Sequence, residues 1–281
     1  MDDLTTYAQN TWCPGCSNFG IFNAFKDAIR ELEERGTSRD RVIMTAGIGN
    51  HAKIFDYLKL SGFYSLHGRS MATAQGIKMA NPDLKVVTFA GDGDAYGEGM
   101  AHMIFAAKRN ADITVIVHNN GVYALTTGQI TPVSEKGTKG PSTPNGSVEP
   151  PLNPLALMLE AGATFIARGY PLWMDQLTEI IVSAVEHEGF SIVEVLQPCI
   201  SFNNTYAKYN DMTEVLKKTP ESYDEVMKVV KMKDKIPIGI MYKVKRPTYH
   251  RELYGNSNPV MDRVKKEDRR ERIQELIWAR Y

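Results

Sequence analysis

Residues 91–120 read GDGDAYGEGMAHMIFAAKRNADITVIVHNN, and this segment gives the clearest indication of the fold. It begins with Gly-Asp-Gly directly after an apolar run at residues 86–90, and it ends with Asn-Asn directly after a second run at 113–117. Between the two runs, residues 97–110 carry apolar side chains at helical spacing. The pattern predicts a strand–helix–strand unit, whose right-handed crossover makes the two strands parallel neighbours in one sheet.

The polar ends of both predicted strands emerge at the carboxyl edge of the sheet, where open α/β sheets bind ligands. We therefore expect Asp92 and Asn120 to converge on one point. A carboxylate and an amide oxygen beside a helix N-terminus suit a magnesium ion that is shared with a phosphate group. Gly-Asp-Gly alone also occurs in ordinary strand–helix turns whose Asp only caps the helix, but the second motif at this spacing favours the magnesium–phosphate site.

The rest of the chain extends the same alternation of strands and helices. Through about residue 200 it predicts one doubly wound parallel α/β sheet, with residues 1–200 as the main domain and 201–281 as a C-terminal extension. Besides the unit above, the predicted elements are helices at 20–34, 70–80, 154–161, 174–188 and 222–230, and strands at 41–45, 164–167, 191–196 and 236–244.

Two further segments have functional interpretations. Residues 131–154 are rich in Pro, Gly, Ser and Thr, and an ordered loop of this length usually covers a site or meets a partner, with disorder as the alternative. Residues 260–281 are highly charged, but apolar residues share one face of the predicted helix. A solvated helix is the default interpretation, and docking on another subunit would explain the apolar face better.

Composition limits the class of protein. With 281 residues the chain can bury a large core. Lys+Arg and Asp+Glu number 33 each, so neither nucleic acid nor an acidic membrane is indicated as a partner. There is no apolar run of membrane-spanning length, and MDDLTTYAQN lacks the basic and apolar regions of a secretory signal. We expect a cytoplasmic protein.

Cysteine is rare, and its three positions are informative. Cys13 and Cys16 form a Cys-x-x-Cys motif, and Cys199 follows the predicted strand at residues 191–196. An odd, small number of cysteines in a cytoplasmic chain indicates metal or redox chemistry rather than a disulfide scaffold. The motif alone serves iron–sulfur clusters, zinc sites and redox pairs equally well.

Taken in order, several motifs resemble the β subunit of 2-oxoacid:ferredoxin oxidoreductases, over roughly residues 10–245. The GDG and NN motifs are similar to the thiamine diphosphate motif. The resemblance implies that the chain binds thiamine diphosphate with Mg²⁺ and a [4Fe–4S] cluster. It also implies an α subunit, in an α2β2 heterotetramer or a heterodimer, which supplies the glutamate that activates the aminopyrimidine. The motifs are WCPGC, AGIG before SLHGR, GDGDAYGEGM, AAKRNADITVIVHNN with GVYALTTGQ, and LQPC.

The activity implied by the resemblance is the reversible, coenzyme A-dependent oxidative decarboxylation of a 2-oxoacid to acyl-CoA and CO₂. The electrons would pass through the cluster to ferredoxin. Among the substrates we favour 2-oxoglutarate over pyruvate, with Lys53 or a residue of the α subunit pairing with its distal carboxylate. Two alternatives are a thiamine diphosphate-dependent non-oxidative decarboxylase or carboligase subunit, and a non-catalytic zinc-binding protein.

The resemblance also assigns site residues. Asp92, the side chain of Asn120 and the backbone carbonyl of Val122 would hold Mg²⁺. His67 and Lys53 are the candidate catalytic residues, with a structural histidine and a solvated lysine as the respective alternatives. The residues expected to bind the cofactor are Ile48, Gly49, His67, Gly91, Asp92, Gly93, Asp94, Asn120, Val122, Leu125 and Thr126.

One position departs from the family pattern. Members with a four-cysteine cluster carry Cys directly after Gly-Ile-Gly, where this chain has Asn50 followed by His51. Cys13, Cys16 and Cys199 match three ligands, whereas a [4Fe–4S] cluster normally has four thiolates. We hypothesise that the His51 imidazole replaces the fourth thiolate. An open or water-bound iron and the absence of a cluster are the alternatives.

Overall fold

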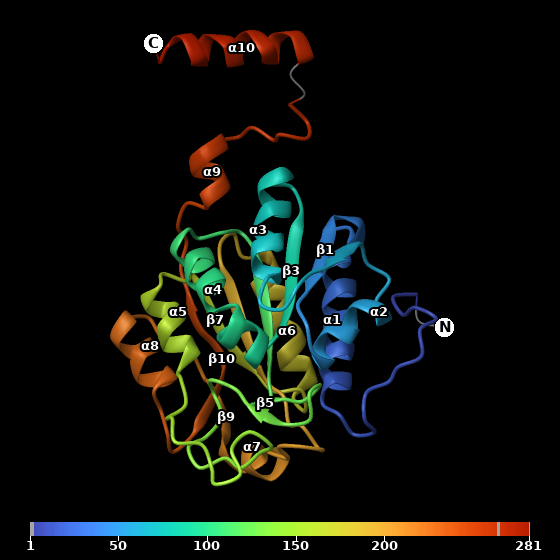
Figure 1. Ribbon diagram of the computed structural model, residues 1–281, viewed down its shortest axis with the longest axis vertical. Helices are drawn as coiled ribbons and strands as arrows, with labels where there is room; N and C mark the ends of the chain where they lie inside the picture. The colour runs from blue at the N-terminus through green and yellow to red at the C-terminus, as the bar shows by residue number, and fades with distance from the viewer. Residues whose placement is uncertain (1–2, 263–264, 281) are drawn as a thin grey trace.

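The computed structural model describes residues 3–262 and 265–280, in which helices cover both faces of one eight-stranded sheet (Figure 1). In spatial order the strands are β2 (Gly62–Tyr64), β1 (Val42–Ala46), β3 (Lys85–Gly91), β4 (Thr114–Asn119), β8 (Ser191–Leu196), β7 (Phe165–Gly169), β10 (Ile236–Lys243) and β9 (Thr213–Val215). The first six strands all run parallel to one another. The predicted parallel α/β sheet is therefore confirmed.

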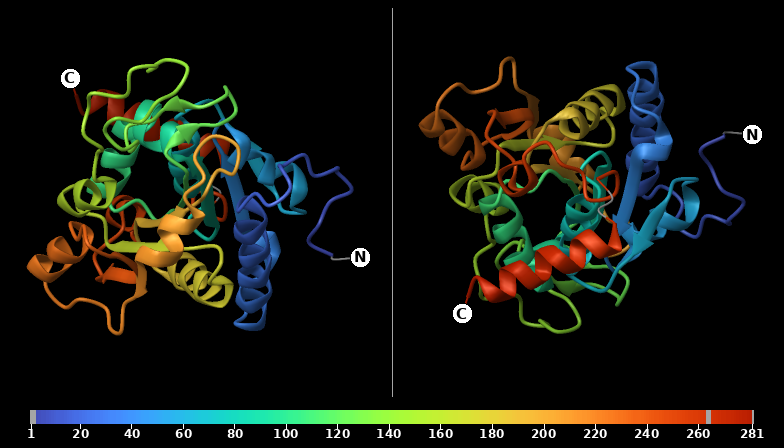
Figure 2. Two further views of the ribbon diagram at one scale, coloured as in Figure 1. Left: turned by 90° about the horizontal axis from the view of Figure 1, so that it is seen from below. Right: turned by 90° about the horizontal axis from the view of Figure 1, so that it is seen from above.

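Two apolar cores lie on opposite faces of the sheet, because successive side chains of a strand point to opposite sides. On β3, Val87 and Phe89 face one core, whereas Val86 and Ala90 face the other. The first core is covered by α1 (Asn18–Glu34) and α6 (Met174–Glu186), which lie side by side (Figure 2). The second is covered by α3 (Ser70–Ala80), α4 (Met100–Lys108), α5 (Pro154–Glu160) and α8 (Tyr223–Val230).

The connection between β3 and β4 differs in detail from the predicted helix at residues 97–110. It begins with a π-helical turn, η3 (Gly93–Glu98), and becomes α-helical only at Met100. π-Helical turns are frequent at functional sites. Here the turn carries most of the Gly-Asp-Gly-Asp motif around the carboxyl edge of the sheet.

Three short elements follow β1 or precede it. They are η1 (Arg39–Arg41), η2 (Asn50–Lys53) and α2 (Ile54–Tyr57). The turn η2 directly follows the glycine loop at the end of β1, so it lies at the same edge of the sheet as η3.

The segment after β4 has ordered structure of its own. Strands β5 (Val122–Tyr123) and β6 (Gln129–Ile130) form a small antiparallel hairpin. In the long loop that follows, the Ser134 hydroxyl donates to the Gly121 carbonyl at 2.6 Å, and the Gly137 N–H donates to the Ser147 carbonyl at 2.8 Å. The loop predicted from composition is therefore folded against the carboxyl edge rather than disordered.

The C-terminal extension begins within the main sheet. It contains α7 (Tyr206–Met212) and the edge strands β9 and β10, of which β10 pairs antiparallel with β7. Then come α9 (Tyr249–Tyr254) and α10 (Lys266–Trp278), and α10 stands apart from the body at the end opposite β5 and α7 (Figure 1). Its Leu276 and Trp278 are each 68% exposed. Among the described residues, no helix has the length and apolar character to cross a membrane.

Candidate active site

A cavity of about 90 Å³ lies at the carboxyl edge of β1, β3 and β4. The structure brings together at this point every residue that the sequence suggested for cofactor binding. The cavity is lined by Ile48, Gly49, Asn50, His51, His67, Gly91, Asp92, Gly93, Asp94, His118, Asn120, Val122, Tyr123, Ala124, Leu125 and Thr126.

Asp92 is one of two buried aspartates that line this cavity. The Thr131 hydroxyl donates to its Oδ2 at 2.6 Å, and the Asn120 N–H donates to its Oδ1 at 3.2 Å. Burial raises the pKa of Asp92 to about 6 despite these two hydrogen bonds. A cation in the cavity would oppose this effect and favour the carboxylate.

Asn120 completes the oxygen-rich side of the cavity. Its Nδ2 donates to Gln197 Oε1 at 2.8 Å, which leaves its Oδ1 to accept from the Val122 N–H at 3.0 Å. A carboxylate, an amide oxygen and a nearby main-chain carbonyl form the donor set that Mg²⁺ prefers. The residues of this site therefore fit the ion that the motif implies.

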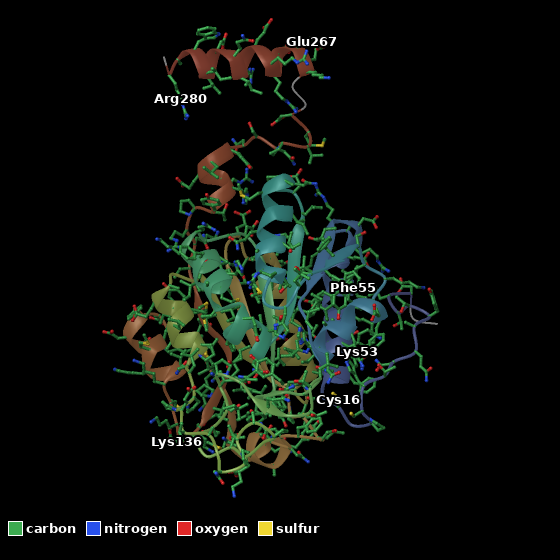
Figure 3. The ribbon with its side chains drawn as sticks, viewed as in Figure 1. Cys16, Lys53, Phe55, Lys136, Glu267 and Arg280 are labelled. Atoms are coloured by element: carbon green, nitrogen blue, oxygen red, sulfur yellow. The ribbon has the colours of Figure 1, made fainter. Side chains whose placement is uncertain are left out.

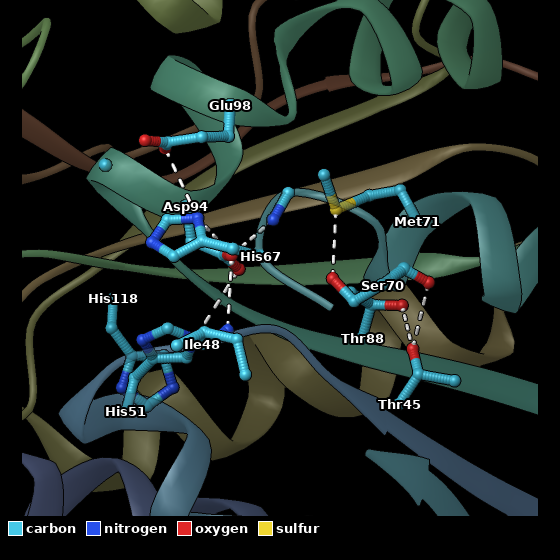
Figure 4. Close-up of polar contacts among 12 residues, drawn as sticks. Thr45, Ile48, His51, His67, Ser70, Met71, Thr88, Asp94, Glu98 and His118 are labelled. Atoms are coloured by element: carbon cyan, nitrogen blue, oxygen red, sulfur yellow. Dashed lines mark hydrogen bonds and ion pairs between the residues drawn. The ribbon is translucent and has the colours of Figure 1, made fainter. Parts of the chain in front are cut away.

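Asp94 connects two loops at the site rather than pointing freely into the cavity. Its Oδ1 accepts hydrogen bonds from the Ile48 N–H at 3.2 Å and from the Gly68 N–H at 2.7 Å (Figure 4). These bonds join the glycine loop after β1 to the loop before α3. A Cβ at Gly47 would overlap the Asp94 carboxylate, so the approach requires glycine.

His67 lies at the mouth of the cavity between two carboxylates. Its Nδ1 is 3.2 Å from Asp94 Oδ1 and 3.3 Å from Glu98 Oε2, without the geometry of a hydrogen bond to either (Figure 4). Its side chain is 35% exposed. The ring therefore stands where it could donate a proton or a hydrogen bond to an anionic ligand.

Buried polar atoms without a hydrogen-bond partner are concentrated in this cavity. Among the described residues, six buried side-chain atoms lack a partner, and four of them belong to residues that line it. Buried polar groups are normally paired, so such a cluster indicates a place for a polar ligand. The four atoms are His51 Nε2, His67 Nδ1, Asp94 Oδ2 and His118 Nε2.

The three cysteines line a second cavity, of about 60 Å³. Cys13 Sγ lies 3.6 Å from the Ser201 hydroxyl, and the Gln197 amide donates to Cys16 Sγ at 3.7 Å. Burial, and to a lesser extent the neighbouring Cys199 and Cys13, raise the pKa of Cys16. All three thiols are free. In the described ranges, no three His, Cys, Asp or Glu side chains are grouped so as to hold a single metal ion.

The two cavities share a wall. Asn50, Asn120 and Ala124 line both of them. The cysteines therefore lie close to the residues of the first cavity, and Cys199 is placed there because it follows β8 at the same edge of the sheet.

His51 lines the first cavity only, and Lys53 lines neither cavity. The His51 ring lines the first cavity, with Nε2 3.6 Å from Asp94 Oδ2 and its centroid 5.7 Å from that of His118, and it is not part of the cysteine cavity. Lys53, which is labelled in Figure 3, donates from Nζ to the Thr11 hydroxyl at 2.9 Å and does not line the first cavity.

Sequence reasoning missed several residues of the site. Gln197 directly follows a predicted strand, so its place at the carboxyl edge could have indicated it. His118 is the single ionisable residue in the apolar strand β4, which is a weaker signal. Thr131 gave no signal, because its contact with Asp92 depends on the path of the preceding hairpin.

The parallel α/β sheet and the polar cavity at its carboxyl edge agree with a thiamine diphosphate-binding domain, and the family comparison identifies the chain as one. Residues 45–195 match the family model described as the C-terminal TPP binding domain of thiamine pyrophosphate enzymes. Residues 199–257 match the model described as the C-terminal part of the pyruvate ferredoxin oxidoreductase beta subunit.

The chain belongs to the family of 2-oxoacid:ferredoxin oxidoreductase β subunits. It is 40% identical over 272 residues to 2-oxoacid:ferredoxin oxidoreductase subunit beta of Saccharolobus solfataricus, a match that covers 90% of this chain and 88% of the relative. It is also 40% identical to 2-oxoglutarate synthase subunit KorB of Archaeoglobus fulgidus, over 69% of this chain and 72% of that protein. As a β subunit of an oxidoreductase, it acts with an α subunit on small-molecule substrates.

A solved structure supports both the fold and the family. The chain superimposes with a TM-score of 0.89, at 32% identity, on 2-oxoglutarate:ferredoxin oxidoreductase from Magnetococcus marinus. The match covers 96% of this chain and 94% of the other, whose structure contains 2-oxoglutarate, coenzyme A and succinyl-CoA.

Proposed function

We propose that this β subunit and its α subunit catalyse the reversible, coenzyme A-dependent oxidative decarboxylation of 2-oxoglutarate to its acyl-CoA and CO₂, with ferredoxin as the electron acceptor. The observation that carries the proposal is the cluster of unpartnered polar atoms in a cavity that shares a wall with three cysteines. A non-oxidative decarboxylase or carboligase would have no need for thiols at that place.

The cofactor would be held by residues of the first cavity. Asp92, the Asn120 side chain and the Val122 carbonyl are the proposed Mg²⁺ ligands. When bound, thiamine diphosphate supplies a carbon nucleophile for the keto group and an electron sink for the departure of CO₂. The remaining contacts are proposed for Ile48, Gly49, His67, Gly91, Gly93, Asp94, Leu125 and Thr126.

Residues of this chain would hold the loops of the site in position and donate hydrogen bonds to the cofactor. Asp94 holds two loops together, so that the main chain at Ile48 and Gly68 keeps a fixed position. His67 would donate to an oxygen of the diphosphate from the cavity mouth. The glutamate that activates the aminopyrimidine would come from the α subunit.

Cys13, Cys16 and Cys199 are the proposed ligands of the [4Fe–4S] cluster. Soft thiolates suit iron, and the shared wall would place the cluster beside the cofactor, so that electrons have a short path. Ferredoxin would take up the electrons from the cluster.

The choice of 2-oxoglutarate draws support from the relatives named KorB and from the Magnetococcus marinus enzyme. A distal carboxylate needs a cationic or hydrogen-bonding group, and Lys53 lies outside the cavity. We therefore propose that the α subunit supplies this group. The exposed apolar residues of α10 suit a contact with another subunit of an α2β2 assembly. We propose that this assembly is cytoplasmic.

The test is co-expression with the cognate α subunit, followed by coenzyme A-dependent reduction of a viologen dye with 2-oxoglutarate or pyruvate. We expect turnover with 2-oxoglutarate and a lower kcat/KM with pyruvate. The Asp92→Asn complex is the inactive control. If neither 2-oxoacid supports dye reduction by a complex that contains thiamine diphosphate, the proposed function is wrong; preference for pyruvate would overturn only the substrate.

A further inference from the structure

The number of cysteines sets a limit on any cluster in this chain. The sequence contains three, and all three line the same cavity. A four-iron cluster normally takes one thiolate per iron. If this chain holds such a cluster, as the proposed function requires, one iron has no thiolate from this chain.

The other polar side chains of the cysteine cavity are, with one exception, already engaged. Asn18 Oδ1 is 2.8 Å from His118 Nδ1, and the Ser201 hydroxyl contacts Cys13 Sγ. Asn120 and Gln197 bond to each other at 2.8 Å, while the Thr11 hydroxyl accepts from Lys53. The exception is Asn50, whose side-chain amide makes no hydrogen bond within residues 3–262 and 265–280. It is therefore free to face a ligand.

The main chain at Gly49 and Asn50 is held in place by two contacts. Gly49 has a φ of 149°, a conformation that favours glycine, and a Cβ there would lie 2.8 Å from the His51 ring. The buried indole of Trp12 donates to the Asn50 carbonyl at 2.7 Å. As a result, Asn50 lines both the cysteine cavity and the first cavity, which we call the cofactor cavity. The neighbouring His51 lines only the cofactor cavity.

We propose that the cluster held by Cys13, Cys16 and Cys199 has one iron without a thiolate ligand, and that this iron faces Asn50 and the cofactor cavity. The inference rests on the proposed function. The neutral amide oxygen of Asn50, or a water molecule that it orients, completes the coordination of that iron. This assignment differs from one through His51, whose ring lines the first cavity and not the cysteine cavity.

Two properties follow from this arrangement. A cluster with one neutral ligand carries less negative charge than one with four thiolates, so its reduction potential is higher. The unique iron is also the one that is lost on oxidation. A one-electron oxidant such as ferricyanide converts [4Fe–4S]²⁺ into [3Fe–4S]⁺ and Fe²⁺, and ferricyanide takes up the electron that is released.

The experiment compares three anaerobically purified complexes with the α subunit: wild type, Asn50→Cys and His51→Ala. Each is treated with ferricyanide and an Fe²⁺ chelator, and the released iron and the EPR signal of [3Fe–4S]⁺ are measured. We expect wild type and His51→Ala to release about one more iron per β chain than Asn50→Cys, which gains the fourth thiolate. The potential of Asn50→Cys should also be lower.

The inference is wrong if wild type and Asn50→Cys release equal amounts of iron. It is also wrong if His51→Ala releases as little iron as Asn50→Cys. If Asn50→Cys does not fold, imidazole or cyanide added to the reduced wild-type complex provides the second measurement. A shift of the EPR spectrum supports an exchangeable site on the unique iron, and an unchanged spectrum contradicts it. If the purified wild-type complex contains iron and sulfide but does not reduce the viologen dye, only the proposed activity is refuted. If the complex contains neither iron nor sulfide, the cluster itself is refuted.

Discussion

The Thr131 hydroxyl donates to Asp92, with 2.6 Å between Oγ1 and Oδ2. Thr131 directly follows β6, and its N–H is bonded to the Ser134 hydroxyl at 2.8 Å. Ser134 in turn donates to the Gly121 carbonyl, beside Asn120 and Val122. The first turn of the long loop is thus hydrogen-bonded to residues beside the proposed Mg²⁺ ligands, so we expect cofactor binding and the order of the loop to be coupled.

Thr131→Val should weaken Mg²⁺ binding without abolishing it. The substitution removes a hydrogen bond that lowers the pKa of Asp92, so burial raises this pKa further and the carboxylate is less available. A bond of about 1 kcal/mol corresponds to a roughly five-fold higher Kd for Mg²⁺, measured by calorimetry at saturating thiamine diphosphate. Thr138→Val, which removes a bond to the Glu135 carbonyl in the same loop, should leave the Kd unchanged. Equal effects of both variants would contradict the coupling.

Gly47→Ala should disturb the site, because the new methyl group would overlap the Asp94 carboxylate. We expect the free energy of unfolding to fall by about 1–3 kcal/mol and the affinity for thiamine diphosphate to fall with it. Gly76→Ala is the matched control. Gly76 lies within α3 with open space around it, so alanine should stabilise the helix by about 0.5–1 kcal/mol. Urea unfolding of both variants measures these changes. If Gly47→Ala unfolds with the same free energy as the wild type, the close contact between residue 47 and the Asp94 carboxylate is refuted.

The buried ion pair between β7 and β8 should be sensitive to removal of one partner. Arg168 Nε lies 2.7 Å from Glu194 Oε2, and the Glu194 side chain is 2% exposed. Arg168→Met leaves a buried carboxylate without its cation, which costs about 3–5 kcal/mol. Adding Glu194→Gln should recover much of the loss, since the amide still accepts from Asn119. Lys218→Met, in an exposed pair with Glu221, should change urea unfolding by less than about 1 kcal/mol.

Stability should decline in mild acid because of buried histidines. Burial lowers the pKa of His187 to about 4, and the pKa values of His118 and His250 are also lowered. For such a group the stabilisation is complete above the unfolded pKa of about 6.5 and is lost as the pH falls towards 4. His187 alone should contribute on the order of 2 kcal/mol of loss between pH 7 and pH 5. The pH dependence of urea unfolding should be weaker in His187→Gln, and an unchanged profile would contradict this assignment.

The convergence of Asp92 and Asn120 could be predicted from the sequence, because both follow apolar strands joined by one helix-length segment. Parallel strands that are neighbours present their carboxyl ends together, so motif positions translate directly into positions in space. The same reasoning located Cys199 and the glycine loop after β1, and it could have located Gln197.

The direction of individual side chains in turns could not be predicted in this way. Asn50 and His51 are adjacent in sequence but line different sets of cavities, because the backbone at Gly49 and the turn η2 determine where each points. The contact of Thr131 with Asp92 was equally hidden, since it depends on the length of the β5–β6 hairpin. Likewise, the antiparallel direction of β10 depends on the connection through residues 201–235 rather than on its apolar pattern.

Because Asn50, Asn120 and Ala124 line both cavities, cofactor binding and the properties of the cysteine site cannot change independently at these positions. Any substitution in the wall alters the surroundings of the cofactor and of the thiols at once. Selection for tighter cofactor binding at these positions would therefore also shift the electronic properties of the cysteine site, and the reverse holds as well. The divergence of such an enzyme towards new substrates is consequently easier through residues that line only one cavity than through these three.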